Sequence, residues 1–232
     1  MQSSSLITGG AGFIGYHLAR HLLEENKEAK LVLVDNLQRG KRDADVENLL
    51  KNPRVKFLKL DLTNPASYKQ IGKGYEHVYH LAAMNGTKLF YEMPQEVLRV
   101  NTLSLIYMLE WFRTENPEGK FCFTSSNESY AGGLSAFGQL PIPTPEKVPL
   151  VIDDPYNPRW SYAATKIVGE LFEEDRRISL KPDVASVKTK GKNMVERNAF
   201  RQCPDQVRGR TQLDHIVNFF ITKLAYSAAA SN

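Results

Sequence analysis

The chain has 232 residues, of which 42% are hydrophobic and 24% charged, the balance of an ordinary globular protein. Residues 1–172 carry 19 basic and 19 acidic side chains and residues 173–232 carry 11 and 7, so the net charge of +4 lies in the C-terminal quarter. A neutral main body argues against nucleic acid as a partner, because binding a phosphate backbone requires a concentrated basic face.

Cysteine content and hydropathy exclude further classes. Cys122 and Cys203 cannot make a disulfide framework, and no pair has metal-ligand spacing, so we expect no metal site. The sequence contains no run of 18 apolar residues, so no membrane span is predicted. The first twenty residues lack the pattern of a signal peptide. A reducing, cytoplasmic location is therefore expected.

Short apolar runs alternate with helical patterns up to about residue 180. Strands are predicted over residues 4–7, 31–34, 55–60, 77–81 and 121–124. Helices are predicted over residues 13–23 and 95–113, and a further helix is predicted to end near residue 51. Strands that are apolar throughout and followed by helices are typical of parallel strands buried on both faces. The predicted fold class is α/β, a doubly wound parallel sheet of the Rossmann type.

The rest of the chain is less regular. Residues 131–158 are rich in Gly and Pro and are predicted to form a long loop, often a lid or substrate loop. A helix is predicted over about 160–177 and a sixth strand over 184–187, while residues 213–230 have the spacing of an amphipathic helix. We therefore divide the chain into a Rossmann domain, 1–187, and a divergent C-terminal tail, 188–232.

The first strand runs into a glycine-rich turn with glycines at Gly9, Gly12 and Gly15. The first allows the tight turn, the second lets a pyrophosphate approach the helix N-terminus, and the third lets helix and strand pack closely. Asp35 ends the second strand, twenty residues after Gly15, where a carboxylate accepts hydrogen bonds from the ribose of NAD. Strand, turn, helix and acid together predict a dinucleotide site; the alternative is a tight turn without a ligand.

Basic residues follow this acid. Arg39, Lys41 and Arg42 could serve the 2′-phosphate of NADP, but a solvated loop is the simpler interpretation. Since Asp35 would repel a 2′-phosphate, NAD is favoured as the cofactor.

Tyr162 and Lys166 lie four residues apart at the start of a predicted helix, so they share one face. An ammonium beside a phenol stabilises the phenolate and moves the tyrosine pKa toward neutrality. Such a tyrosine can remove a proton from an alcohol while hydride leaves the same carbon. The alternative is an exposed helix face.

The order of these motifs resembles the extended short-chain dehydrogenase/reductase family, in particular its NAD-dependent nucleotide-sugar epimerase/dehydratase branch. The resemblance covers about residues 3–172 and rests on these stretches in family order: Thr8 to Gly15, Val34 to Leu37, Asp61-Leu62, His80 to Ala83, Val100 to Thr102, Thr124 to Ser126, and Ser161 to Lys166.

The resemblance implies a role for each matched residue. Tyr162 would transfer the proton, Lys166 would bind the nicotinamide ribose, and Ser126 would hydrogen-bond the reacting oxygen. The implied cofactor-binding set is Gly9, Gly12, Phe13, Ile14, Gly15, Asp35, Asn36, Asp61, Leu62, Leu81, Ala82, Ala83, Asn101, Tyr162 and Lys166. Singly these residues have simpler alternatives: Asp61 could cap the following turn, and Asn101 could satisfy helix backbone.

Glu128 bears on the reaction type. In the family the residue two before the tyrosine of this segment, here Tyr130, faces the sugar; it is small in simple 4-epimerases and often a glutamate in 4,6-dehydratases and decarboxylases. A 4-keto group acidifies the C5 proton, which a carboxylate can then remove. An isomerase or a lyase acting through a 4-keto sugar is thus implied; the alternative for Glu128 is a solvated or cation-paired loop carboxylate.

The resemblance ends in the last quarter. Residues 188–192 match none of the signature that opens the family's substrate domain, so that domain is expected to be truncated or absent. A catalytically impaired NAD-binding protein derived from such an enzyme is the alternative function. The resemblance also implies a nucleotide-sugar substrate and a homodimer through the helices near 95–113 and 160–177.

Overall fold

A computed structural model describes residues 4–141, 144–145, 148–179 and 185–187. Its strands are β1 (Ser4–Thr8), β2 (Lys30–Asp35), β3 (Val55–Lys59), β4 (His77–His80), β5 (Lys120–Thr124) and β6 (Ala185–Val187). Its helices are α1 (Phe13–Glu25), α2 (Ala44–Leu50), α3 (Thr87–Glu92), α4 (Pro94–Glu115), α5 (Ala131–Phe137) and α6 (Trp160–Ser179), with short 3-10 turns η1 (Pro65–Gln70) and η2 (Asn127–Tyr130).

The six strands form one sheet in the order β3-β2-β1-β4-β5-β6, and every neighbouring pair is parallel. The order reverses at β1, where the chain first builds outward to β3 and then returns to place β4 on the other side. Parallel strands put their carboxyl ends on one edge, and a ligand crevice opens where the order reverses. The predicted doubly wound α/β fold, including its sixth strand, is confirmed.

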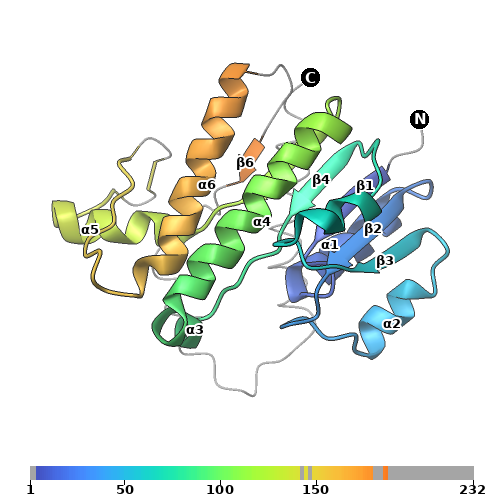
Figure 1. Ribbon diagram of the computed structural model, residues 1–232, viewed down its shortest axis with the longest axis horizontal. Helices are drawn as coiled ribbons and strands as arrows, with labels where there is room; N and C mark the ends of the chain where they lie inside the picture. Colours follow the sequence, from blue (N-terminus) through green and yellow to red (C-terminus); the bar gives the residue numbers. More distant parts are fainter. Residues whose placement is uncertain (1–3, 142–143, 146–147, 180–184, 188–232) are drawn as a thin grey trace.

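Each face of the sheet is covered, which explains why the strands are apolar throughout. Leu6 of β1 joins the core that α4 covers with Leu105 and Met108. Ile7, the next residue, joins the opposite core with Leu18 of α1. Successive side chains of β1 thus enter different layers, and α4 and α6 lie side by side on one face (Figure 1).

The prediction of a loop throughout residues 131–158 is wrong for its first part, where α5 forms. A Cβ on Gly132 would lie 1.9 Å from the carbonyl oxygen of Val151. Gly132 therefore lets the helix pack against the returning chain, although its residue type is typical of a turn. The helix ends at Gly138, whose φ of 72° is left-handed.

The predicted helix over 213–230, and with it the tail 188–232, lies outside the described residues. Within the described residues, no helix is long and apolar enough to cross a membrane.

Candidate dinucleotide and active site

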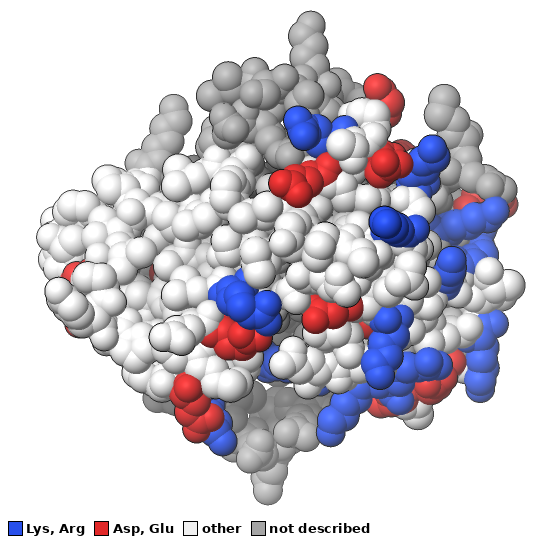
Figure 2. Space-filling view, in the orientation of Figure 1, with Lys and Arg blue, Asp and Glu red and all other residues white. Residues whose placement is uncertain are grey.

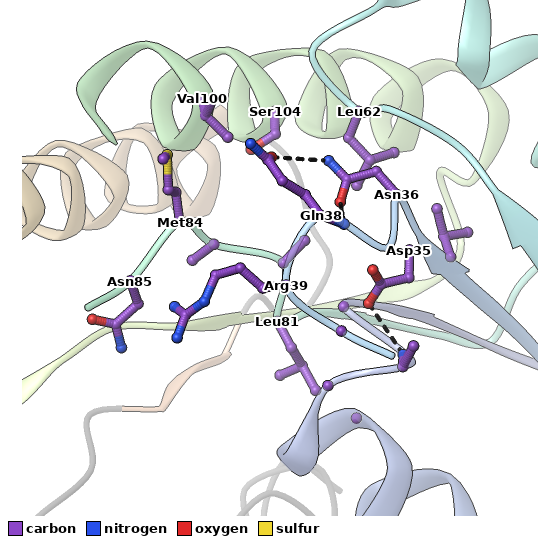
Figure 3. A pocket seen from close by; sticks show the side chains of 18 of the residues that line it. Asp35, Asn36, Gln38, Arg39, Leu62, Leu81, Met84, Asn85, Val100 and Ser104 are labelled. Atoms are coloured by element: carbon purple, nitrogen blue, oxygen red, sulfur yellow. Dashed lines mark hydrogen bonds between the residues drawn. The ribbon is translucent and has the colours of Figure 1, made fainter. Parts of the chain in front are cut away.

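A cavity of about 800 Å³ opens at the carboxyl edge of the sheet beside the reversal of strand order. Figure 3 shows side chains reaching into it from the loops that follow β2 and β4 and from helix α4. It is lined by almost all of the predicted cofactor residues, namely Gly9, Gly12, Phe13, Ile14, Gly15, Asp35, Asn36, Asp61, Leu62, Leu81, Ala82, Ala83, Tyr162 and Lys166. The fold thus brings together segments that lie far apart in the sequence.

The glycine turn forms one wall of the cavity. A Cβ on Gly15 would lie 2.3 Å from the carbonyl oxygen of Gly9, so this close passage admits only glycine. Gly9 has a left-handed φ of 68°. Helix α1 starts after Gly12 with no acidic residue in its first turn, so its leading amides are suited to an anion.

The two predicted acids lie at the ends of β2 and β3. The Asp35 carboxylate accepts hydrogen bonds from the backbone amides of Ala11, at 3.1 Å, and Leu37, at 2.8 Å, and so ties the glycine turn to the next loop. Oδ1 of Asp61 accepts from the amide and the hydroxyl of Thr63, both at 2.9 Å. Asp61 therefore does cap its turn, and it also lines the cavity.

The wall after β4 is held by Thr8, whose Oγ1 accepts from the amides of Leu81 and Ala82, both at 3.1 Å. The same oxygen lies 3.0 Å from Nδ1 of His80. Burial, with the nearby charge of Lys166, lowers the pKa of His80 to about 3. A neutral imidazole can accept the remaining hydroxyl proton, so Thr8 donates to His80.

Asn101 does not line the cavity but lies behind it. The Oδ1 atom accepts from the amide of Met84 at 2.6 Å, while Nδ2 donates to the carbonyl of Met84 at 3.1 Å and to Oγ1 of Thr165 at 3.3 Å. The side chain therefore satisfies loop backbone and joins the chain after β4 to α6. Asn101 therefore positions the loop after β4 relative to α6.

Tyr162 and Lys166 share the buried face of α6. The Lys166 ammonium donates to the carbonyl of Thr124 at 2.7 Å and lies 5.5 Å from the centre of the Tyr162 ring. Tyr162 stacks on Phe90 with the ring centres 5.2 Å apart. These contacts exclude the alternative of an exposed helix face.

The sequence predicted a lowered tyrosine pKa, and for this arrangement that prediction is wrong. Burial raises the pKa of Tyr162 to about 12, although a hydrogen bond with Ser126 opposes the rise. The lysine charge is turned toward a carbonyl, so desolvation of the phenol dominates. Ser126 nonetheless lies close enough to Tyr162 to oppose part of this rise in pKa.

Glu128 lies in η2, directly after β5. Its Oε2 lies 3.6 Å from Nη2 of Arg159, and the two side chains are 36% and 46% exposed. Its charge also raises the pKa of Tyr162, so it lies near the tyrosine. The carboxylate is therefore paired with a cation and close to the candidate proton-transfer group.

The cavity has further lining residues that motif reasoning missed. They include Gln38, Met84, Asn85, Leu89, Met93, Val100, Ser104, Thr124 and Ser125. Arg39 and Lys41, interpreted from the sequence as solvated, also line it, whereas Arg42 instead pairs with Glu47 at 2.7 Å. Val100, Thr124 and Ser125 lie within matched stretches but had no predicted role. The others lie between motifs, and only their adjacency to matched stretches could have indicated them.

Within the described residues, no group of three or more His, Cys, Asp or Glu side chains could hold a metal ion. The polar groups around the cavity are backbone amides and cations, which donate hydrogen bonds, and carboxylates, which accept them; such a set suits a nucleotide.

Comparison with known proteins agrees with this geometry. The model of the GDP-mannose 4,6-dehydratase family matches residues 6–189. A putative UDP-glucose 4-epimerase from Methanocaldococcus jannaschii is 32% identical over 168 residues, which are 72% of this chain and 48% of that protein. The resemblance inferred from the motifs is confirmed.

Solved structures of similar fold include the UDP-N-acetylglucosamine 4-epimerase from Methanobrevibacter ruminantium M1 in complex with UDP-N-acetylmuramic acid. It superposes with a TM-score of 0.67 and 25% identity, over 81% of this chain and 55% of that one. The UDP-glucose 4-epimerase from Bifidobacterium longum in complex with NAD⁺ and UDP superposes with a TM-score of 0.65 and 26% identity. The match covers 80% of this chain and 52% of that one. The chain spans about half the length of these proteins.

Proposed function

The chain belongs to the GDP-mannose 4,6-dehydratase family, and from that premise we propose that it binds NAD and acts on a nucleotide sugar through a 4-keto intermediate. The observation that carries the proposal is the cavity itself, where the glycine turn, two acids and the Tyr162–Lys166 pair meet. The proposed reaction class is that of an epimerase or dehydratase.

The residues around the cavity fit a dinucleotide. The glycine turn passes too close to neighbouring backbone for a Cβ at Gly9 or Gly15, and it brings the amides that open α1 to the wall of the cavity. Asp35 and Asp61 line the end where ribose hydroxyls and adenine would lie, and NAD is favoured because Asp35 would repel a 2′-phosphate. Tyr162 and Lys166 mark the nicotinamide end.

NAD⁺, when bound, supplies the hydride acceptor for C4 of the sugar. Tyr162 would take the C4 hydroxyl proton as the C4 hydride leaves, and Ser126 would hydrogen-bond the same oxygen. Lys166, whose ammonium donates to the Thr124 carbonyl, would also bind the nicotinamide ribose. In an epimerisation, Tyr162 would return the proton to the C4 oxygen as the hydride returns to C4.

Glu128 provides the additional proton transfer that a dehydratase needs. Its position near Tyr162 would let the carboxylate remove the C5 proton after C4 is oxidised, while the C6 hydroxyl leaves as water. The pair with Arg159 keeps the carboxylate near this point.

A catalytically impaired NAD-binding protein is the second candidate. One observation favours it: burial raises the pKa of Tyr162 to about 12, which makes the phenol a poor proton acceptor near neutral pH. It would retain the dinucleotide site without turnover.

The first experiment is mass spectrometry of the native protein, then of the small molecules released on denaturation. We expect one NAD⁺ or NADH per chain, followed by turnover of UDP-glucose, UDP-N-acetylglucosamine or GDP-mannose detected by product mass. Tyr162→Phe should retain NAD and lose turnover by about 10²–10⁴-fold. NAD without turnover in the unaltered protein would support the second candidate, and no NAD binding would reject both.

We also propose a homodimer through α4 and α6. Figure 2 shows charged side chains gathered over β3 and α2 and a largely uncharged surface over α5 and α6. In the two helices of the proposed interface, Leu98 of α4 is 40% exposed and Leu171 of α6 is 66% exposed. An apolar patch shared by two copies is the usual basis of a two-fold interface.

We expect light scattering to give twice the chain mass, and Leu171→Glu to give the single-chain mass. Leu134→Glu, on the exposed side of α5, is the matched control and should leave the mass unchanged. A monomeric unaltered protein would contradict the dimer.

A further inference from the structure

Arg39, in the loop between β2 and α2, is a cation of the cavity that the proposed reaction leaves without a role. The charged residues lining the cavity are Asp35, Arg39, Lys41, Asp43, Asp61 and Lys166. Three acids and three bases therefore share one crevice, and their partners decide which charges are available to a ligand.

The three acids are satisfied by groups of the protein. Asp35 and Asp61 accept the hydrogen bonds described above, and Asp43 caps α2 by accepting from the amide of Val46 at 3.0 Å. Lys166 donates to the Thr124 carbonyl. Among the described residues, no carboxylate lies within ion-pair distance of Arg39 or Lys41, so these two cations keep their charge for a ligand.

Of Arg39 and Lys41, the structure shows a contact across the cavity for Arg39. Both terminal nitrogens of Arg39 lie 3.8 Å from the position that a Cβ on Gly86 would take, in the loop after β4. Figure 3 shows the side chain directed toward Asn85 and away from Asp35 and Leu62. The Arg39 side chain therefore spans the cavity from the loop after β2 to the loop after β4.

The neighbouring Gly40 places the Arg39 loop close to the glycine turn. A Cβ on Gly40 would lie 3.1 Å from the carbonyl carbon and oxygen of Ala11, so the loop passes directly over the glycine turn. The backbone at Arg39 therefore lies near the glycine turn that precedes α1, and its guanidinium lies at the wall formed by the loop after β4. Its charge also acts on Tyr162, which places it toward the nicotinamide half of the cavity.

We propose that Arg39 binds the diphosphate of the dinucleotide from the side opposite α1, so that the anion lies between the helix N-terminus and a guanidinium. The inference rests on the proposed NAD site. A planar guanidinium can donate two parallel hydrogen bonds to phosphate oxygens. Because the side chain turns away from Asp35, where the adenosine ribose would lie, a 2′-phosphate is not its ligand.

Calorimetry on protein freed of nucleotide tests this role with NAD⁺, NADP⁺ and ADP-ribose. Arg39→Gln should raise the dissociation constants of NAD⁺ and ADP-ribose by the same factor, about tenfold or more, because a charge-assisted hydrogen bond is lost. Arg39→Lys should lose less. Arg42→Gln is the matched control: it removes the same charge from the same loop, but Arg42 pairs with Glu47 and does not line the cavity.

Other results would overturn the inference. Equal affinities of the Arg39→Gln and Arg42→Gln variants for NAD⁺ would show that Arg39 does not touch the diphosphate. Tighter binding of NADP⁺ than NAD⁺, lost in Arg39→Gln, would assign the arginine to a 2′-phosphate. Failure of the unaltered protein to bind NAD⁺ would instead reject the proposed function and, with it, this role.

Discussion

A single hydroxyl, that of Thr8, connects β1 to the wall of the cavity that follows β4. It accepts two amide hydrogen bonds and donates to His80, which burial keeps neutral by lowering its pKa to about 3. The arrangement therefore does not change between about pH 5 and 8, because the imidazole does not titrate there. We therefore expect the hydrogen bonds that Thr8 accepts from Leu81 and Ala82 to be independent of pH in this range.

Glu128→Gln separates the two reaction types at the residue scale. If the reaction is a dehydration, turnover should fall by about 10²–10⁴-fold while oxidation of the sugar persists, because the amide cannot accept the C5 proton. Reduced nicotinamide should then accumulate, which absorbance measures directly. If the reaction is an epimerisation, turnover should stay within about threefold of that of the unaltered protein.

Arg159→Gln is the companion variant. It removes the 3.6 Å ion pair but keeps the carboxylate, so it should retain more turnover than Glu128→Gln in a dehydratase. Equal losses in the two variants would show that the pair, and not the carboxylate, is what the reaction requires.

At the scale of elements, α5 depends on a close approach between chain segments. Gly132 of α5 faces the carbonyl oxygen of Val151 at a distance that leaves no room for a side chain. The contact links η2 and α5, which follow Glu128, to the segment that leads into α6.

Gly132→Ala should lower the free energy of unfolding by about 1–3 kcal/mol, because the added methyl group overpacks this contact. Urea denaturation measures the effect. Ser135→Ala, on the exposed side of the same helix, should change it by less than about 0.5 kcal/mol. An unchanged midpoint for Gly132→Ala would mean that α5 does not pack against Val151.

At the scale of the whole molecule, buried phenols make stability sensitive to alkali. Burial raises the pKa values of Tyr68, Tyr75, Tyr79 and Tyr162 above their ordinary value of 10.0. The unfolded chain releases these protons first, so the stabilisation is complete below about pH 10 and is lost as pH rises above it.

The urea midpoint should therefore fall between about pH 9 and 11, each buried phenol contributing at most about 1.4 kcal/mol per pH unit. Tyr79→Phe should weaken this dependence. Tyr156→Phe should not, since that side chain is 94% exposed and meets solvent in both states. A midpoint that does not change over this range would contradict the burial of the phenols.

Local patterns account for much of the fold and for the cofactor wall. The apolar strands, the glycine spacing, Asp35 at the end of β2, and Tyr162 and Lys166 on one helix face depend on contacts within one turn or one strand–helix unit. Such contacts have a fixed period along the chain, so they can be predicted from it. The six-stranded parallel sheet and the dinucleotide crevice follow from them.

Tertiary structure decided what depends on distant neighbours. The contact of Lys166 with the Thr124 carbonyl spans 42 positions, and the raised pKa of Tyr162 comes from burial that no spacing encodes. Gly132 lies in a helix because Val151 passes beside it, and Arg39 enters the cavity because its loop crosses the glycine turn. Desolvation and long-range packing set these features, so they exist only once the chain has folded.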